Sequence, residues 1–311
     1  MRRSDEALSS GVREMVLASP HLTAVAGGAA EVDRMLDEIE DGWVDSFGRR
    51  IHLDVHPAAE AKATIVFQPG SGAHARNYFL LGGLLARLGY ETIAVDRPGH
   101  GLSDGERGDC TVEEAIAAAG AAIDLARSRS PRPVVLMGSS MGGLLTVFGL
   151  LKGLQPDLAV AHNFLFPGRL LSFRMRSRWI NRRRTKPYPL VKLVHGFENL
   201  SADPAVAQYM RDRTDTYMAW DLSARSVASL FGFSAKKVAH APETLVITGD
   251  KDKAIPAWAT RTFIRFSGLP RYEVRTLPGA GHLLFHDHLE QTIPLITEWM
   301  DARLRAADPG C

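Results

Sequence analysis

Short apolar runs rich in β-branched residues alternate with helical patterns along most of the chain, and this alternation constrains the fold most. A strand followed by a helix and a second strand predicts a βαβ unit, and successive units build a parallel sheet flanked by helices. Two runs at 43–47 and 51–55 flank Gly48 and predict an opening hairpin. The remaining expected strands occupy residues 64–68, 92–95, 134–137, 158–166, 244–248 and 273–277.

The βαβ pattern stops after residue 166 and resumes near residue 242, which predicts an inserted unit. Residues 167–241 have mostly helical patterns, so we expect a helical cap inserted after the sixth strand. Residues 43–166 and 242–311 then form an α/β core with a mostly parallel sheet, and residues 1–42 form an N-terminal helical extension. A chain of 311 residues is long enough for one such domain with an insertion.

Composition and charge argue against several other classes of protein. Cys110 and Cys311 are the only cysteines, which predicts neither a disulfide framework nor a zinc site and favours a reducing compartment. The residues after Arg3 lack the apolar segment of a secretory signal, and no run of about 18 apolar residues predicts a membrane-spanning helix. The formal net charge of +2 indicates no particular partner. We therefore expect a cytoplasmic protein, whose oligomeric state the sequence leaves open.

The strongest chemical signal is segment 138–142, which reads Gly-Ser-Ser-Met-Gly and matches the pattern G-x-S-x-G. It follows the predicted strand 134–137 and precedes an apolar helical pattern, the context in which this pattern forms a nucleophile elbow. The sharp turn exposes the serine hydroxyl, and the flanking glycines let strand and helix come close together. We predict that Ser140 is a nucleophile; the alternative is a glycine- and serine-rich turn without chemistry.

A serine nucleophile needs a base, and the base needs a group that orients it. After a nucleophile elbow, the acid and then the histidine are expected in loops that follow later strands. Asp250 and Asp252 both follow the strand 244–248. We favour Asp252, because a residue further into the loop can reach back to the histidine, whereas Asp250 is better placed to form the turn.

The base is expected in the glycine-rich loop after the strand 273–277, which ends at His282. His286 and His288 are nearby rivals, but they fall in or beside the next helix. The oxyanion formed during acyl transfer needs amide donors, and the amide after the nucleophile belongs to Met141. The loop after the third strand supplies the second donor, for which we predict the amide of Ser71.

These residues together resemble the α/β-hydrolase superfamily, and more narrowly its monoacylglycerol lipase and lysophospholipase-like branch. Segment 70–74, with Asn77 and Tyr78, is similar to the oxyanion-loop motif of that branch. Residues 96–107 look like its D-x-x-G-H-G-x-S-x-G-x-R stretch, in which Asp96 and His100 would organise the loop. The resemblance implies ester hydrolysis through a serine acyl-enzyme without a cofactor or a metal.

Two positions depart from the pattern of that branch. Pro69 stands where the family usually has a histidine before the first glycine, and Ser139 replaces the histidine of the usual G-H-S-M-G elbow. Both lie beside the nucleophile and the oxyanion loop, so they bear on the substrate class more than on the mechanism. The resemblance covers about residues 43–166 and 242–304, and hardly touches the cap.

The cap contains a strongly basic segment mixed with aromatic and aliphatic residues, which suits contact with anionic lipid. The alternative is a solvated basic face, and no nucleic-acid-binding motif accompanies it. Large apolar residues in the rest of the cap favour a lipid-like or otherwise apolar ester substrate. The basic residues are Arg169, Arg174, Arg176, Arg178, Arg182, Arg183, Arg184 and Lys186, and the candidates for the substrate pocket are Phe197, Tyr209, Tyr217 and Trp220.

Other functions are compatible with the same fold, because one scaffold hosts many chemistries. An esterase or thioesterase for a soluble small molecule, or an acyltransferase, would use the same three residues with a differently shaped cap. A non-catalytic binding protein would be expected to have lost one of Ser140, Asp252 and His282. A metal hydrolase is disfavoured, because residues 286–288 lack the spacing of metal ligands on a helix face.

Overall fold

The computed structural model describes residues 3–164, 187–189, 200–212, 215–233 and 238–307. Its strands are β1 (Glu40–Ser46), β2 (Arg49–His56), β3 (Ala63–Gln68), β4 (Tyr90–Val95), β5 (Val134–Ser139), β6 (Leu158–His162), β7 (Tyr188–Pro189), β8 (Asp221–Leu222), β9 (Glu243–Gly249) and β10 (Tyr272–Leu277). Its helices are α1 (Arg3–Ala18), α2 (Pro20–Ala26), α3 (Ala29–Asp37), the 3₁₀ helix η1 (Ala75–Tyr78), α4 (Phe79–Arg87), α5 (Val112–Arg129), α6 (Met141–Leu151), α10 (Pro204–Asp212), α11 (Ala224–Gly232), α12 (Ala257–Ser267), α13 (Leu284–Asp287) and α14 (Leu289–Ala307).

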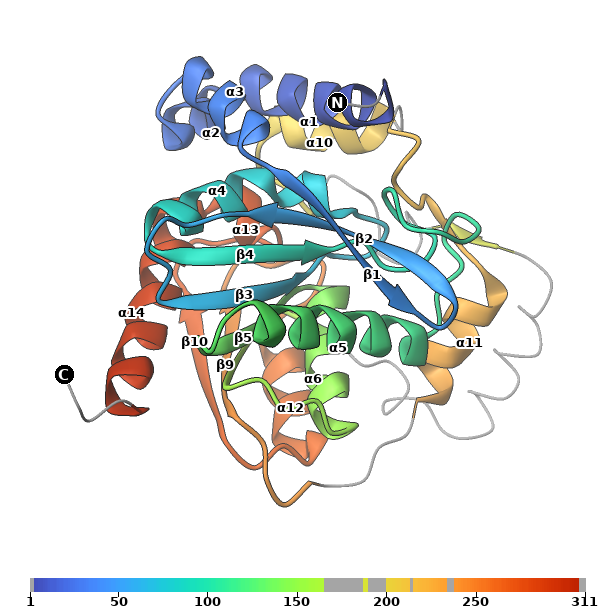
Figure 1. Cartoon of the computed structure of the whole chain (residues 1–311), viewed down its shortest axis with the longest axis vertical. Helices are drawn as coiled ribbons and strands as arrows, with labels where there is room; N and C mark the ends of the chain where they lie inside the picture. The colour runs from blue at the N-terminus through green and yellow to red at the C-terminus, as the bar shows by residue number, and fades with distance from the viewer. Residues whose placement is uncertain (1–2, 165–186, 190–199, 213–214, 234–237, 308–311) are drawn as a thin grey trace.

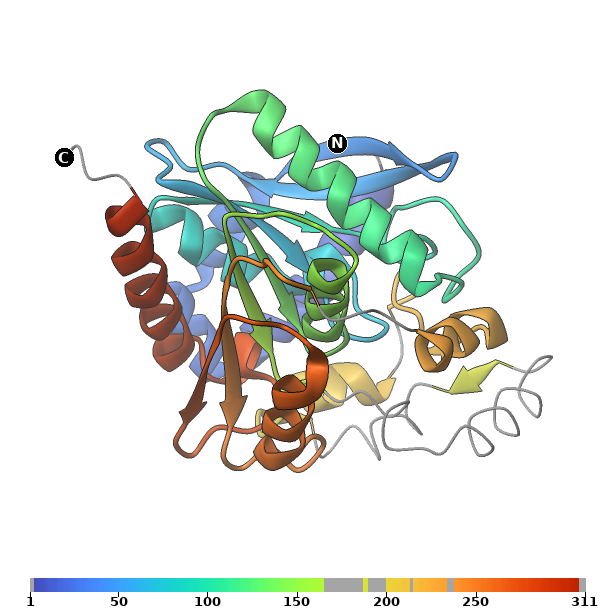
Figure 2. The same ribbon diagram turned by 90° about the horizontal axis from the view of Figure 1, so that it is seen from below.

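The central sheet confirms the predicted α/β class. Its strand order is β1-β2-β4-β3-β5-β6-β9-β10, and helices cover both faces (Figure 1 and Figure 2). β2 pairs antiparallel with β1, as the predicted hairpin requires, and it also pairs antiparallel with β4. The other neighbouring strands pair in parallel. The carboxyl ends of β3, β5, β9 and β10 therefore meet at one edge, where open α/β sheets place their sites.

Burial on both faces explains why the central strands are continuously apolar. Every residue of β3 and β5 is buried, and alternate side chains face opposite layers. Phe67 joins the cluster formed by α1–α4, α13 and α14, whereas Val66 packs with α5. α5 begins at a capping box, in which Thr111 and Glu114 exchange hydrogen bonds of 2.8 and 3.2 Å.

The described part of the cap region is not wholly helical. It contains α10 and α11, but also the two-residue strands β7 and β8, which pair antiparallel. This pairing joins residues far apart in sequence, so the local helical patterns could not predict it. The basic segment from Arg169 to Lys186 and the pocket candidate Phe197 lie outside the described residues. Among the described helices, none has the length and apolar character needed to cross a membrane.

The residues before β1 form the helices α1, α2 and α3, which lie against the sheet domain. α1, α2 and α3 pack together, and α1 also packs against α10 (Figure 1). β1 begins at Glu40, a little earlier than expected, because Glu40 pairs with Val55 of β2. The extension and the first hairpin are therefore continuous with the core.

A charged cluster, buried except for Asp41, joins this hairpin to η1. The ring nitrogens of His52 lie 2.9 Å from Asp96 Oδ2 and 2.9 Å from Asp41 Oδ1. Asp54 accepts two hydrogen bonds from the guanidinium of Arg76, over 2.8 and 2.9 Å. Burial opposes a charge on His52, but its hydrogen bonds to Asp41 and Asp96 outweigh this effect and raise its pKa to about 10.

We expect the free energy of unfolding to fall as the pH rises from about 6.5 to about 10. In this range the folded protein keeps a proton on His52 that the unfolded chain, with a pKa near 6.5, has released. The folded state thus binds more protons than the unfolded chain. The contribution of His52 to the free energy of unfolding is therefore complete below pH 6.5 and is lost towards pH 10. Urea unfolding at several pH values measures the slope, which should be shallower in His52→Gln by up to about 1.4 kcal/mol per pH unit. Equal slopes would contradict this account.

Candidate active site

Ser140 lies on a sharp turn between β5 and α6. Its φ is 51°, in the left-handed region that costs a non-glycine residue about 1–3 kcal/mol and is often retained at functional sites. The flanking glycines allow this turn by close approach. A β-carbon on Gly138 would lie 2.2 Å from the carbonyl oxygen of Gly142, and one on Gly142 would lie 1.9 Å from that of Gln68. The G-x-S-x-G pattern is thus a steric requirement of this turn.

The structure brings Ser140, His282 and Asp252 together in one chain of hydrogen bonds. His282 Nε2 lies 3.0 Å from Ser140 Oγ, and His282 Nδ1 lies 2.6 Å from Asp252 Oδ2. His282 follows β10 and Asp252 follows β9, as expected from the order of the strands. Both residues are buried, with 2% of the surface of His282 and 6% of that of Asp252 exposed. Water therefore competes little for these hydrogen bonds.

The second carboxylate of the β9 loop lies apart from this constellation. Asp250 is exposed, and its Oδ1 accepts a hydrogen bond of 2.7 Å from the amide of Gly279. Asp252 Oδ1 instead accepts hydrogen bonds from the amides of Ala254 and Ile255, over 2.8 and 2.7 Å. These hydrogen bonds fix the orientation of the carboxylate towards His282.

Asn163 also contacts Asp252, and sequence reasoning missed it. It directly follows β6, has a φ of 27°, and donates a side-chain hydrogen bond to Asp252 Oδ2. Its side-chain oxygen accepts a hydrogen bond of 2.9 Å from Thr260 of α12. The available signal was its position, since a polar residue at the carboxyl end of a parallel strand points to the site edge.

The rival histidines have other partners. His286 Nε2 lies 3.1 Å from the carbonyl oxygen of Asn77, and burial lowers its pKa to about 4. His288 Nε2 accepts a hydrogen bond of 3.1 Å from the amide of Gly281. His286 still borders the pocket described below, but as a neutral ring directed at the backbone. Neither histidine is hydrogen-bonded to Ser140.

Arg97 anchors the loop that carries Ser71. The guanidinium of Arg97 is buried and donates to the carbonyl oxygens of Pro69 and Gly70, over 2.6 and 2.9 Å. Met141 is the first residue of α6, so its amide has no acceptor within the helix and lies at the positive end of the helix dipole. Both predicted donor residues thus lie beside the elbow.

A pocket of about 590 Å³ opens onto Ser140 and His282. Tyr209 of α10 is part of its wall, as proposed for the cap candidates, whereas Tyr217 and Trp220 are not. The Trp220 ring nitrogen instead donates a hydrogen bond of 2.9 Å to the backbone of Asp215. The wall is mainly apolar, formed by Met15, Leu200, Val206, Met210, Met218 and Leu283.

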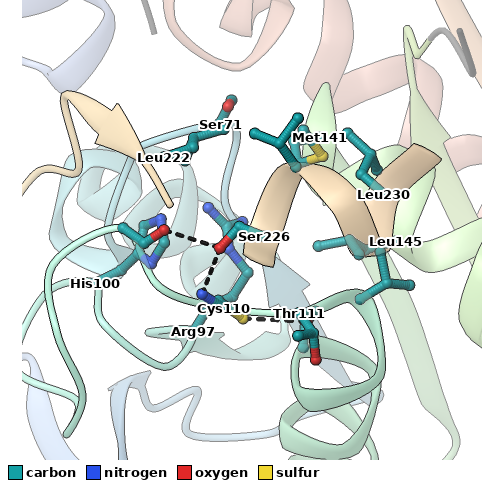
Figure 3. Close-up of a pocket in the computed structure, with 14 residues that line it drawn as sticks. Ser71, Arg97, His100, Cys110, Thr111, Met141, Leu145, Leu222, Ser226 and Leu230 are labelled. Atoms are coloured by element: carbon teal, nitrogen blue, oxygen red, sulfur yellow. Dashed lines mark hydrogen bonds between the residues drawn. The ribbon is translucent and has the colours of Figure 1, made fainter. Parts of the chain in front are cut away.

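A second pocket of about 430 Å³ shares Ser71 with the first and extends to Met141 (Figure 3). Its wall comes largely from α5, α6 and α11 and from the loop after β4. Ser226 of α11 accepts a hydrogen bond of 2.7 Å from the amide of Cys110 and donates one to Gly108, which ties the cap to that loop (Figure 3). A substrate held at Ser71 therefore has space in two pockets.

A buried carboxylate connects the cap to the Ser71 loop. Asp215 Oδ2 lies 2.7 Å from His74 Nε2 and also accepts a hydrogen bond from the Tyr209 hydroxyl. Asp215 Oδ1 accepts the amide of Tyr217, over 2.8 Å. Burial opposes ionisation of Asp215, but the hydrogen bond from His74 outweighs it and lowers the Asp215 pKa to about 2.

We expect Asp215→Asn to lower kcat/KM for ester hydrolysis by about tenfold, because a hydrogen bond to a charged group contributes about 1.5–3 kcal/mol. The loss should fall on substrates that fill the pocket, while labelling of Ser140 by a small fluorophosphonate should persist. Asp221→Asn, at an exposed cap position, is the matched control and should leave kcat/KM unchanged. An unchanged kcat/KM in Asp215→Asn would show that this contact does not position the loop.

The arrangement as a whole defines a class of protein. A serine lies on a strand-to-helix elbow of a mostly parallel sheet, and it is hydrogen-bonded to a histidine whose other ring nitrogen contacts an aspartate. This arrangement is typical of serine hydrolases with the α/β-hydrolase fold. Residues 65–295 match the model of the alpha/beta hydrolase family. The chain belongs to that family.

Relatives of known name agree with this assignment. A monoacylglycerol lipase from Mycolicibacterium smegmatis is 25% identical, over 83% of this chain and 95% of that protein. A soluble variant of monoglyceride lipase from Saccharomyces cerevisiae has a TM-score of 0.68 at 16% identity, covering 86% of this chain and 94% of its own. A monoacylglycerol lipase from Paleococcus ferrophilus has a TM-score of 0.65 at 23% identity, covering 80% and 97%. The first match agrees with the predicted resemblance to the monoacylglycerol lipase branch, and the two solved structures share the fold of this chain.

Proposed function

We propose that this chain hydrolyses carboxylic esters that have an apolar acyl group, with Ser140 as the nucleophile. The observation that carries the proposal is the chain of hydrogen bonds from Ser140 through His282 to Asp252, which opens into an apolar pocket. A serine placed in this way is activated by the adjacent base, and the base is oriented by the carboxylate. The lipases similar to this chain support the same reaction class.

The mechanism follows from the positions of these groups. His282 Nε2 takes the hydroxyl proton as Ser140 Oγ attacks the ester carbonyl, and Asp252 stabilises the imidazolium that forms. The amides of Met141 and Ser71 donate to the oxyanion of the tetrahedral intermediate. His282 then gives the proton to the leaving alcohol. It afterwards takes a proton from the water that attacks the acyl-enzyme, and returns it to Ser140 Oγ as the acid leaves.

The apolar wall favours a lipid-like acyl group, and a monoacylglycerol is the substrate class that the similar lipases suggest. In this proposal residues 43–166 and 242–311 form the core and residues 167–241 form the cap. Tyr209 and Met210 of α10 then bring the cap to the pocket beside Ser140. The residues that act on the ester come from the core, and the cap shapes the space around it.

The test is hydrolysis of p-nitrophenyl esters from acetate to palmitate and of monoacylglycerols, together with labelling by a fluorophosphonate. We expect labelling of the folded wild-type protein and a preference for acyl chains longer than acetate, because apolar contact stabilises each added methylene by about 0.8 kcal/mol. Folded wild-type protein that neither reacts with the probe nor cleaves any ester would refute the proposal. A preference for acetate would instead indicate a small-ester esterase.

A further inference from the structure

The wall of the Ser140 pocket includes a residue from outside the region that matches the family. The match covers residues 65–295, whereas Met15 belongs to α1 in the N-terminal extension. Met15 borders the same pocket as Ser140 and His282, and only 6% of its surface is exposed. A segment without any recognised motif therefore contributes directly to the space beside the nucleophile.

Contacts on two sides of α1 hold it in place beside this pocket. It packs on α10, which supplies Val206, Tyr209 and Met210 to the wall (Figure 1). Gly11 of α1 lies next to the Tyr209 ring, because a β-carbon built there would be in ordinary van der Waals contact with Cε2, at 3.5 Å.

The other side of α1 is tied to the helix that follows the Ser71 loop. Arg76 of η1 donates a hydrogen bond of 2.5 Å to Ser9 Oγ of α1, and the same guanidinium is anchored by the buried Asp54. Arg13 of α1 also pairs with Asp33 of α3, over 2.5 Å. Met15 is thus held by contacts on two sides rather than by a loose terminal segment.

We propose that Met15 bounds the acyl site where α1 meets α10, and that it sets the length of acyl chain the enzyme accepts. This inference rests on the proposed ester hydrolysis. An unbranched thioether side chain fills irregular apolar space and suits contact with a flexible acyl chain. Its volume occupies space that a longer chain would need, so the N-terminal extension acts as a specificity element while the core performs the chemistry.

The experiment changes the size of residue 15 in both directions and measures kcat/KM across p-nitrophenyl esters from acetate to palmitate. Met15→Trp should lower kcat/KM for the longer esters by about 10- to 100-fold and shift the optimum to shorter chains. Met15→Ala should shift the optimum to longer chains. The readout is the ratio of kcat/KM for the longer esters to kcat/KM for the acetate ester, so a loss that affects all esters equally does not count as a shift.

Met35→Ala is the matched control. Met35 is a buried methionine of α3 in the same extension, and it does not border the pocket. Its loss removes apolar packing of the same kind, so it reports general loosening of the extension. The optimum should therefore not move in Met35→Ala.

Three outcomes would decide the matter. Opposite shifts in the two Met15 variants with an unmoved optimum in Met35→Ala would establish the inference. An unchanged chain-length profile in both Met15 variants, or an equal shift in the control, would overturn it while leaving ester hydrolysis in place. Wild-type protein inactive on every ester would instead refute the proposed function, so the two failures are distinguishable.

Discussion

Replacing Ser140 by alanine is expected to lower kcat for ester hydrolysis by about 10⁶-fold, because the nucleophile and its base act as a unit. The hydroxyl that His282 Nε2 meets at 3.0 Å is then absent, and no acyl-enzyme can form at this position. Initial rates with a p-nitrophenyl ester and fluorophosphonate labelling measure the effect. Both should fall to background while the thermal unfolding temperature stays near that of wild type.

The neighbouring serine provides the control for this substitution. Ser139 is buried in the same elbow, and its hydroxyl lies 3.1 Å from His162 Nδ1 rather than from His282. Ser139→Ala should therefore retain labelling and most of the activity. Labelling that survives in Ser140→Ala, or that disappears in a folded Ser139→Ala, would overturn the assignment of the nucleophile.

Asp252→Asn is expected to lower kcat by about 10⁴-fold with little change in stability. The asparagine can occupy the same volume, but its oxygen accepts from the loop amides and its NH2 group then donates to His282 Nδ1, so the ring is held in the wrong tautomer. The 2.6 Å contact between the two side chains makes this dependence direct. Steady-state kinetics over a pH series measures the loss, which should not be recovered at higher substrate concentration.

Asp250→Asn distinguishes the two carboxylates of the same loop. Asp250 is exposed and bonds only to the turn at Gly279 among the described residues, so its replacement should change kcat by less than about tenfold. If Asp250→Asn were the more damaging substitution, the acid would have been assigned to the wrong position. If Asp252→Asn failed to fold, as seen by circular dichroism, the contacts of Asp252 with Asn163 and the loop amides would be needed mainly for stability.

The local parts of this protein could be predicted from the sequence because their determinants are close together in the chain. The elbow is specified by glycines two positions on either side of Ser140. Each must be glycine because a nearby backbone atom leaves no space for a β-carbon. The strands were recognisable because burial on both faces requires continuous apolar runs. The order of Ser140, Asp252 and His282 along these strands then placed the three residues at one sheet edge.

The remaining parts depended on contacts between segments that no local pattern relates. Asn163 meets Asp252 across 89 positions, and His74 meets Asp215 across 141. Of the four cap candidates, only packing could show that Tyr209 is part of the pocket wall while Tyr217 and Trp220 are not. All four candidates were chosen because they are large apolar residues of the cap, so residue type alone could not separate them.

The sequence by itself thus determined the fold class, the elbow and the order of the loops that carry Ser140, Asp252 and His282, because short-range sterics and hydrophobic periodicity encode them. The tertiary structure decided which carboxylate meets His282, which cap residues border the pocket, and that Met15 lies beside the site. These features depend on where α1 and α10 pack against the core. Such packing is a sum of many weak contacts over the whole chain, and no single motif carries it.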